Sequence, residues 1–260
     1  PEGTSASSSG ADTVLIIFLH VVSVNIAMTP HDVDNVNMSF ERPYHHGNLR
    51  AALIEAGLQA LERTDASDLS LRAIARDVGV SANAAYRHFA DKQGLLSAMA
   101  AEGFRRFSAA QQEALRQEPQ GAGTTCSTAT GHAYIAFAQA HPALYRLMFG
   151  HWFSEHRDPE LLAASMAAFH GLVASSAQDM RVDPGDERAL VTAIARWSLV
   201  HGLSHLLLDG QLAMFGDRVD QLVSRVMGMQ QTISPPDSLD EPTPQPNPAK
   251  AVKRRRAARP

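Results

Sequence analysis

Apolar side chains recur at helical spacing along most of the chain after about residue 44. The first stripe follows intervals of three and four residues and consists of Leu49, Ala52, Leu53, Ala56, Gly57, Ala60 and Leu61. Such spacing puts apolar side chains on one face of an amphipathic helix. Further helical patterns cover residues 70–78, 82–89, 92–107, 130–140, 161–180, 187–208 and 215–233. Strand-like alternation is missing from the sequence, so the pattern predicts an all-α fold.

Two of the short helices are separated by a tight turn. Ser70 can cap the first of them, since its hydroxyl can accept a hydrogen bond from the first helical turn. Gly79 is expected to end that helix, because glycine most readily adopts the left-handed conformation of a helix stop. Val80 follows in the turn, and Ser81 can cap the second helix. This arrangement predicts a helix-turn-helix, whose second helix lies in the major groove of DNA.

The stretch from Ser70 to Leu96 resembles the TetR family of transcription regulators. The features that match at the family's spacing are Gly79, Val80, Tyr86, His88, Phe89 and Lys92. The resemblance implies an N-terminal three-helix helix-turn-helix domain followed by a helical ligand-binding and dimerisation domain. Two positions depart from the family: Ala85 replaces a larger aliphatic residue, and Asn83 replaces the common glycine or proline. The first change lightens the packing, and the second is expected to alter operator preference.

The second short helix is expected to divide into an inward and a DNA-facing side. Ala85 and Phe89 are four residues apart and should face inward together with Val80. Helix geometry and the resemblance together nominate the DNA-binding residues Arg72, Ser81, Ala82, Asn83, Tyr86, Arg87, His88 and Lys92. Asn83 has the donor and acceptor needed for a bidentate pair with adenine, and Ala82 is small enough to contact a thymine methyl group.

The remaining nominated side chains have roles that the resemblance implies. Tyr86, Arg87, His88 and Lys92 resemble the residues that contact phosphates in the family, and Lys92 begins a helix, where an anion is favoured. Arg72 can reach a guanine or a phosphate. Structural roles are the alternatives: packing for Tyr86, an internal hydrogen bond for His88 and a solvated surface charge for Arg72.

The balance of charge limits the kind of DNA contact that the chain can make. It has 23 Lys and Arg against 27 Asp and Glu, a net charge of −4. A protein without a large basic surface must bind DNA through a local patch. A short window contains the basic residues Arg72, Arg76, Arg87 and Lys92, but also Asp68, Asp77 and Asp91, which dilute their charge. Any DNA contact must therefore depend on local geometry.

The C-terminal half resembles the part of TetR-type regulators that senses a ligand and dimerises through its last two long helices. Trp197, His201 and Gly202 resemble the Trp-x-x-x-His-Gly (WHG) signature of one subfamily, and His205 continues the same helix face. That face can line a pocket or a dimer seam. The candidate ligand-binding residues are Phe137, Tyr145, Met148, Phe149, Trp152, Phe169, His170, Trp197, His201 and His205. Ordinary core packing is the alternative for each aromatic residue.

Other chemistry has little support in the sequence. No cofactor is expected, and neither a nucleophile–base pair nor a phosphate-binding loop is recognisable, so we expect no enzyme. His201 and His205 have the spacing of two zinc ligands on a helix, but no carboxylate lies between them. A metal-dependent protein therefore stays only as an alternative. Cys126 is the single cysteine, which excludes an internal disulfide and fits a cytoplasmic location.

The sequence suggests four segments. Residues 1–40 are expected to be a disordered or non-native extension, with Met28 and Met38 as candidate starts; the apolar run 14–24 is too short to span a bilayer comfortably, so no membrane partner is expected. Residues 41–95 form the DNA-binding domain, residues 96–233 the ligand-sensing and dimerisation domain, and residues 234–260 a proline-rich linker with a basic tail. The tail, and an arm containing Arg42, His45 and His46, can either contact DNA or be unstructured.

These observations lead to one functional hypothesis and two alternatives. The chain is expected to be a homodimeric repressor that leaves its double-stranded DNA operator when a small apolar ligand binds. One alternative is a DNA-binding regulator or architectural protein without small-molecule induction. The other, from a different class, is the metal-dependent protein based on His201 and His205.

Overall fold

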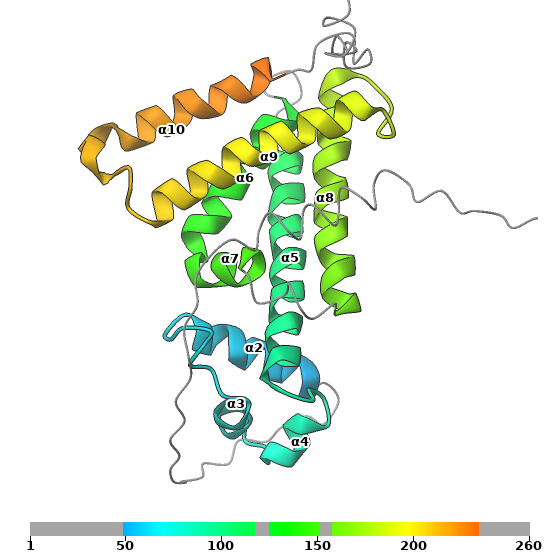
Figure 1. The fold of residues 1–260 in the computed structure, drawn as a ribbon, viewed down its shortest axis with the longest axis vertical. Coiled ribbons are helices and arrows are strands. Elements are labelled where there is room, and N and C mark those ends of the chain that lie inside the picture. Colours follow the sequence, from blue (N-terminus) through cyan, green and yellow to red (C-terminus); the bar gives the residue numbers. More distant parts are fainter. Residues whose placement is uncertain (1–48, 118–124, 151–157, 234–260) are drawn as a thin grey trace, which may run out of the picture.

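The computed structural model describes residues 49–117, 125–150 and 158–233. All regular structure within these ranges is helical, which confirms the predicted all-α fold. Trp152, the arm containing Arg42, His45 and His46, the apolar run 14–24 and the basic tail lie outside the described residues. The helices form a small end built from α2, α3 and α4 and a larger bundle around α5 (Figure 1).

The small end is held together by the apolar stripe of α2 (Leu49–Leu61). Its buried side chains include Leu53, Leu58 and Leu61, and α2 contacts α3 (Leu71–Val78), α4 (Ala82–Tyr86) and α5. Helix α4 ends at Tyr86, so the predicted helix over 82–89 was too long. Phe89 is nevertheless buried, because the chain that follows α4 turns back onto the core.

Helix α5 (Lys92–Gln117) connects the two parts of the molecule. Its 26 residues correspond to about 39 Å of helix, and its first half is buried almost all round. Around it pack α6 (Cys126–Ala140), α7 (Pro142–Phe149) and α8 (Pro159–Met180), with α9 (Glu187–Leu208) crossing α6 and α8 (Figure 1). A change in the bundle can therefore reach the small end directly through α5.

The C-terminal segment differs from its prediction as one helix over 215–233. It consists of a 3-10 helix η2 (Ala213–Arg218), the helix α10 (Val219–Gly228) and a 3-10 turn η3 (Met229–Thr232). The prediction was wrong at its start because Gly216 has φ 52° and ψ −135°, a conformation that interrupts a right-handed helix. Helix α10 and η3 then contact α6.

One described helix, α8, is long and apolar enough to cross a membrane by length and composition. In the structure it packs against α5, α6 and α9, and 39% of its most apolar window is buried inside the protein. The core helix of a soluble domain meets the same criterion. Packing within the bundle thus accounts for the buried part of its apolar surface.

Candidate functional site

The turn between α3 and α4 is fixed by local hydrogen bonds that the sequence pattern predicted. The Ser70 hydroxyl accepts a hydrogen bond from the Ala73 amide at the start of α3, and the Ser81 hydroxyl accepts one from the Ala84 amide at 3.3 Å. Gly79 has φ 81°, and its amide donates to the Arg76 carbonyl at 2.9 Å. Open space surrounds the position of a Cβ on Gly79, so the backbone conformation alone requires glycine. These contacts set the angle between the two helices.

The inward side of α4 is as predicted. Ala85 is fully buried and Phe89 is 4% exposed. Val80 is half-buried and packs against the same core. The small side chain of Ala85 lets α4 lie close to α2 and α3.

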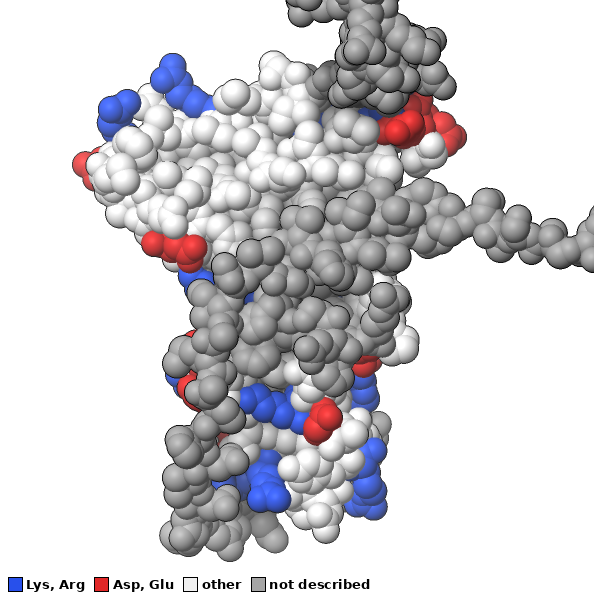
Figure 2. Space-filling model, viewed as in Figure 1, with Lys and Arg blue, Asp and Glu red and all other residues white. Residues whose placement is uncertain are grey.

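The nominated DNA-binding side chains lie mostly on the surface at this end. Ser81, Asn83, Arg87, His88 and Arg72 are exposed, Tyr86 is 41% exposed, and Ala82 is half-buried. Figure 2 shows Lys and Arg side chains around the end of the molecule that α3 and α4 form. Exposed polar groups on a braced helix are what base and phosphate contacts require.

Lys92 has a structural contact that the sequence did not reveal. Its ammonium group donates to the Ser67 carbonyl, and it is half-buried. Burial lowers the pKa of Lys92, although the nearby Asp68 carboxylate acts in the opposite direction. An ammonium group has three N–H bonds, so this contact leaves donors for a phosphate.

The start of α5, where Lys92 was expected to meet an anion, already has a carboxylate. Asp91 Oδ1 accepts a hydrogen bond from the Gly94 amide at 2.8 Å. This capping contact occupies an amide that could otherwise bind a phosphate. The contribution of Lys92 to DNA binding would therefore come from its side chain rather than from the helix start.

A cavity lies inside the bundle, where α5, α6, α8 and α9 meet. One part of its wall is aromatic and consists of Phe104, Phe107, Tyr134, Phe149, Phe169 and Trp197. The other part is polar and consists of Gln111, Ser127, Thr130, Ser165, Arg196 and Gln230. Its volume is about 40 Å³, room for a few water molecules, whereas pockets for drug-sized ligands have roughly 300–1,000 Å³. A larger molecule would have to displace lining side chains.

The candidate ligand-binding residues fall into three groups. Phe149, Phe169 and Trp197 line the cavity. A second group does not line it and packs in the surrounding core or beside it: Phe137, Tyr145, Met148, His201 and His205. His170 is exposed on α8 and faces away from the core. Helical spacing alone could not separate these groups, because the lining depends on how four helices are rotated against one another.

Behind the aromatic wall, four polar side chains converge. His201 Nδ1 lies 2.8 Å from both the Tyr134 and the Tyr145 hydroxyl oxygens, and the Trp197 indole N–H donates to the Tyr134 hydroxyl at 3.3 Å. Burial, together with the neighbouring His205, lowers the pKa of His201 to about 4. His201 is therefore neutral near pH 7, and its Nδ1 can accept a hydrogen bond from a tyrosine hydroxyl. The cluster couples α6 and α7 to α9 without buried charge.

The polar wall rests on a buried ion pair that sequence reasoning missed. Arg196 is 4% exposed, and its Nη1 donates to Asp179 at 3.0 Å and to the Ser127 hydroxyl at 2.5 Å. Asp179 in turn accepts hydrogen bonds from the Cys126 and Ser127 amides at the start of α6. An arginine within a helix that is otherwise apolar was the available signal, since buried charges require partners.

The histidine pair has no metal-binding surroundings in the described parts of the chain. The rings of His201 and His205 lie 4.7 Å apart between centroids. Among residues 49–117, 125–150 and 158–233, no group of three or more histidine, cysteine or acidic side chains could hold a metal ion. The contacts of His201 are instead the two tyrosine hydroxyls.

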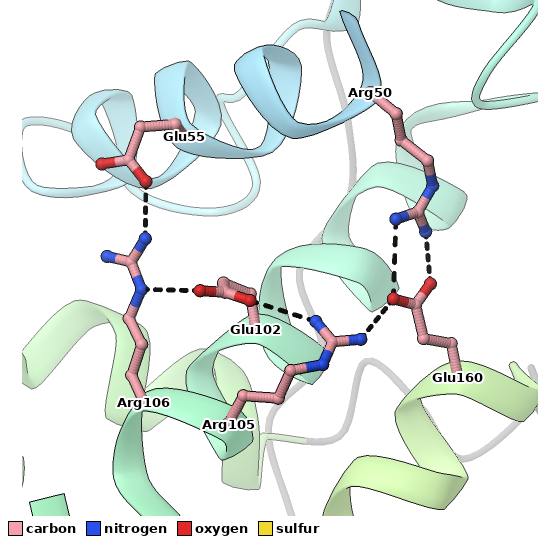
Figure 3. Close-up of polar contacts among 6 residues, drawn as sticks. All are labelled: Arg50, Glu55, Glu102, Arg105, Arg106 and Glu160. Atoms are coloured by element: carbon pink, nitrogen blue, oxygen red, sulfur yellow. Dashed lines mark hydrogen bonds and ion pairs between the residues drawn. The ribbon is translucent and has the colours of Figure 1, made fainter. Parts of the chain in front are cut away.

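A chain of ion pairs joins the small end to the bundle (Figure 3). Glu160, at the start of α8, accepts hydrogen bonds from Arg50 of α2 and Arg105 of α5. Arg105 also bonds Glu102 at 3.1 Å. Glu102 accepts from Arg106 at 3.0 Å. Three helices thus meet in one charged network.

Two features make this network a connection between the small end and the bundle. Arg106 reaches Glu55 of α2 at 2.5 Å, which gives α2 a second anchor. The Arg50 guanidinium also lies over the Phe89 ring, 5.4 Å from its centroid. Burial tends to raise the pKa of Glu160, but hydrogen bonds from Arg105 and Arg50 outweigh it and lower that pKa. Glu160 is therefore ionised at neutral pH and holds both arginines.

An apolar groove of about 460 Å³ separates α9 from α10. Its walls are lined by Leu199, Leu203, Leu206, Leu212, Phe215, Val219, Leu222, Val223 and Val226, with Ser198 and Gly202. Leu206 and Phe215 are 39% and 43% exposed. The face of α9 and α10 carries few charged side chains in Figure 2. Exposed apolar surface of this kind is typical of protein interfaces and of ligand-binding grooves.

Comparisons with known proteins match both ends of the structure. Residues 53–99 match the family model for bacterial regulatory proteins of the tetR family, and residues 127–229 match the model for a tetracyclin repressor-like C-terminal domain. Together these matches cover more than half of the chain.

One curated protein and one solved structure illustrate the similarity. The HTH-type transcriptional regulator BetI of Cronobacter sakazakii (strain ATCC BAA-894) is 28% identical over 154 residues, 59% of this chain and 76% of the relative. The structure of a protein with unknown function from Rhodococcus sp. RHA1 has 33% sequence identity and a TM-score of 0.63. That alignment covers 74% of this chain and 98% of the other.

Proposed function

The chain belongs to the TetR family of DNA-binding transcription regulators, and from that premise we propose that it is a homodimeric, cytoplasmic repressor released from its operator by a small, mainly apolar ligand. One observation carries the proposal. The exposed helix α4 is followed by α5, and α5 lines the internal aromatic cavity. The Trp197, His201 and Gly202 signature further supports assignment to the WHG subfamily.

DNA recognition is assigned to α4 and the residues that flank it. Asn83 would read a base edge, because its amide carries both a donor and an acceptor for adenine. Tyr86, Arg87 and His88 would contact phosphates from the exposed side of the same segment, with Arg72 beside them at the start of α3. Ser81 caps α4 and would contact DNA only from the helix start, where backbone amides favour a phosphate.

Dimerisation is assigned to α9 and α10. The groove between them would receive apolar side chains of a second copy, burying Leu206, Phe215 and Val223. A two-fold dimer presents two recognition helices to a palindromic operator, one helical turn or more apart. We therefore assign residues 41–95 to DNA binding and residues 96–233 to ligand sensing and dimerisation, and α5 passes from the first domain to the second.

Ligand control would act through α5 and α8. Both helices line the cavity, through Phe104 and Phe107 on α5 and through Phe169 on α8. A ligand larger than the present cavity would move these helices apart. Glu160 on α8 would then move Arg50, to which it is hydrogen-bonded. The Arg50 guanidinium lies over the ring of Phe89, in the segment that follows the recognition helix α4. The spacing of the two recognition helices in the dimer would change, and affinity for the operator would fall.

Shift assays test the proposal. Genomic fragments from beside the coding gene are incubated with the purified full chain at low salt, with unrelated DNA as competitor. The expected result is a discrete complex that survives the competitor and is lost in the Tyr86→Ala variant while the dimer stays folded. Absence of any specific complex at low salt would contradict the DNA-binding role. A specific complex that no small molecule from a metabolite set releases would contradict induction alone.

A further inference from the structure

The polar wall of the cavity contains one buried acceptor without a partner. Gln230 is 1% exposed and lines the cavity, and its Oε1 has no hydrogen-bond partner among the described residues. A buried amide oxygen without a hydrogen bond destabilises the protein, because the loss of its contacts with water is not compensated. The surrounding groups therefore decide what a bound molecule must offer at this point.

Three side chains of the polar wall donate hydrogen bonds to backbone carbonyls of the protein itself. The Thr130 hydroxyl donates to the Cys126 and Ser127 carbonyls, and the Gln111 amide donates to the Thr130 carbonyl. The Ser165 hydroxyl donates to the Leu162 carbonyl at 3.0 Å. Among the polar side-chain atoms of the described lining residues, Gln230 Oε1 is the one that is buried without a hydrogen-bond partner.

The positive charge of Arg196 is also committed within the protein. Its Nη1 is paired with Asp179 at 3.0 Å, and its Nε donates to the Gln230 carbonyl at 3.2 Å. The ion pair makes this part of the wall neutral overall. A carboxylate ligand would meet the Gln230 oxygen with a like partial charge and would have to share the guanidinium with Asp179.

The position of the Gln230 side chain is set by its neighbours. The hydrogen bond from Arg196 to its carbonyl fixes the backbone of η3. Gly131 of α6 leaves room for the amide, because a Cβ at that position would lie 2.6 Å from Gln230 Oε1. The acceptor is therefore held at the wall of a cavity that aromatic side chains such as Phe107 and Tyr134 also line.

We infer that the effector is a neutral aromatic molecule with a hydrogen-bond donor at one end, such as a phenol or an arylamine, and that Gln230 Oε1 accepts that hydrogen bond. This inference rests on the proposed function, in which the cavity receives the effector. The aromatic wall takes the ring, and the donor satisfies the buried oxygen. Gln230 lies in η3, the turn that follows α10, so the same contact connects the ligand to the helix assigned to the dimer.

Calorimetry with three small probes tests the inference. Phenol, toluene and benzoate share a ring and differ in carrying a donor, a methyl group or a carboxylate. Their dissociation constants are measured on the full chain without DNA for the wild type and Gln230→Leu. The matched control is Gln231→Leu, since Gln231 is the exposed neighbour in η3.

The expected result is a change in the ratio of the toluene to the phenol dissociation constant. In Gln230→Leu this ratio falls about threefold to tenfold, the effect of one net hydrogen bond, and in Gln231→Leu it does not change. The wild-type protein is expected to bind phenol with a lower dissociation constant than benzoate. If Gln230→Leu does not fold, the same ratio is measured for Gln230→Met, and the dissociation constants of the three probes are compared for the wild type.

Three results would overturn the inference: an unchanged ratio in Gln230→Leu, preference for benzoate in the wild type, or no binding of phenol. Operator binding is measured separately on the same preparations without any probe. Intact operator binding with any of these results leaves the regulator proposal standing. Loss of operator binding with the expected ratio means that the DNA-binding role has failed while the cavity chemistry is as inferred.

Discussion

Asn83 is the side chain on α4 best suited to read a base. It is exposed, and neighbouring Ala85 anchors the helix in the core. Replacing Asn83 with alanine should weaken binding to the specific operator by about 1–3 kcal/mol, because a bidentate pair with adenine is lost. Binding to unrelated DNA should not change. Fluorescence anisotropy with both DNAs measures this, with Gln112→Ala on the exposed side of α5 as control. Equal losses on both DNAs would mean that Asn83 does not read sequence.

His201 makes a prediction about pH. Its pKa is lowered to about 4 in the folded protein, whereas an unfolded histidine titrates near 6.5. The unfolded chain therefore binds more protons between these values, so the stabilising effect of neutral His201 is fully present above about pH 6.5 and is lost as pH falls toward 4. The difference amounts to at most about 3 kcal/mol.

Urea unfolding between pH 4 and 7 measures the contribution of His201. His201→Gln keeps a hydrogen-bonding group without a titrating ring, so its free energy of unfolding should depend less on pH over this range. His132→Gln, at an exposed histidine of α6, is the control. Parallel pH profiles for wild type and His201→Gln would contradict the neutral, buried histidine.

At the residue scale, signals from neighbouring positions in the sequence predicted the DNA-binding end better than they predicted the residues that line the cavity. Ser70, Gly79 and Ser81 act within one turn of their own positions, so their roles follow from neighbouring residues. Tyr134, Arg196 and Gln230 come from three helices and meet only in the folded bundle. No pattern along the sequence specifies the rotation of those helices, so their meeting could not be predicted.

Among the elements, helix identity was more predictable than helix ends. The range 187–208 agrees with α9 at both ends because Asp186 caps its start and the polar Asp209–Gly210 turn follows. Helix α5 extends ten residues past the predicted end at residue 107, since its second half is amphipathic and only partly buried. The ends of α4 and α10 depend on tertiary contacts and on the φ of Gly216, which hydrophobic spacing does not report.

The junction of α2, α5 and α8 gives a prediction about coupling. Glu160→Gln removes the charge that holds Arg50 and Arg105 (Figure 3). The ion pairs are partly exposed, so the loss of stability should stay below about 1 kcal/mol for each pair. The ligand-induced drop in operator affinity should nevertheless shrink, because α8 no longer pulls on α2.

Glu113→Gln is the matched control for this junction. Its ion pair with Arg116 lies within α5 and joins no second helix. Operator affinity with and without the effector, measured for both variants, gives the coupling in each. A full ligand response in Glu160→Gln would mean that the network is structural only, and an equal loss in Glu113→Gln would indicate a general charge effect.

On the scale of the whole molecule, the groove between α9 and α10 predicts a dimer. Leu206→Glu puts a charge into an apolar wall that is exposed in the single chain. The variant should fold but sediment as a monomer, because burying an unpaired carboxylate at an interface is costly. Leu115→Glu, at a similarly exposed leucine near the end of α5, is the control. A Leu206→Glu dimer as stable as wild type would exclude this face as the interface.

Dimerisation and DNA reading together form the central claim, and hydroxyl-radical footprinting on a selected operator fragment tests both at once. The account predicts two protected patches related by two-fold symmetry, about one helical turn or more apart on one face of the DNA. At concentrations that saturate the wild type, the Asn83→Ala variant should protect neither patch. The Leu206→Glu variant should lose both patches at the same time, because a monomer cannot hold two recognition helices in place. A single asymmetric patch, or no sequence-specific protection at low salt, would contradict the account.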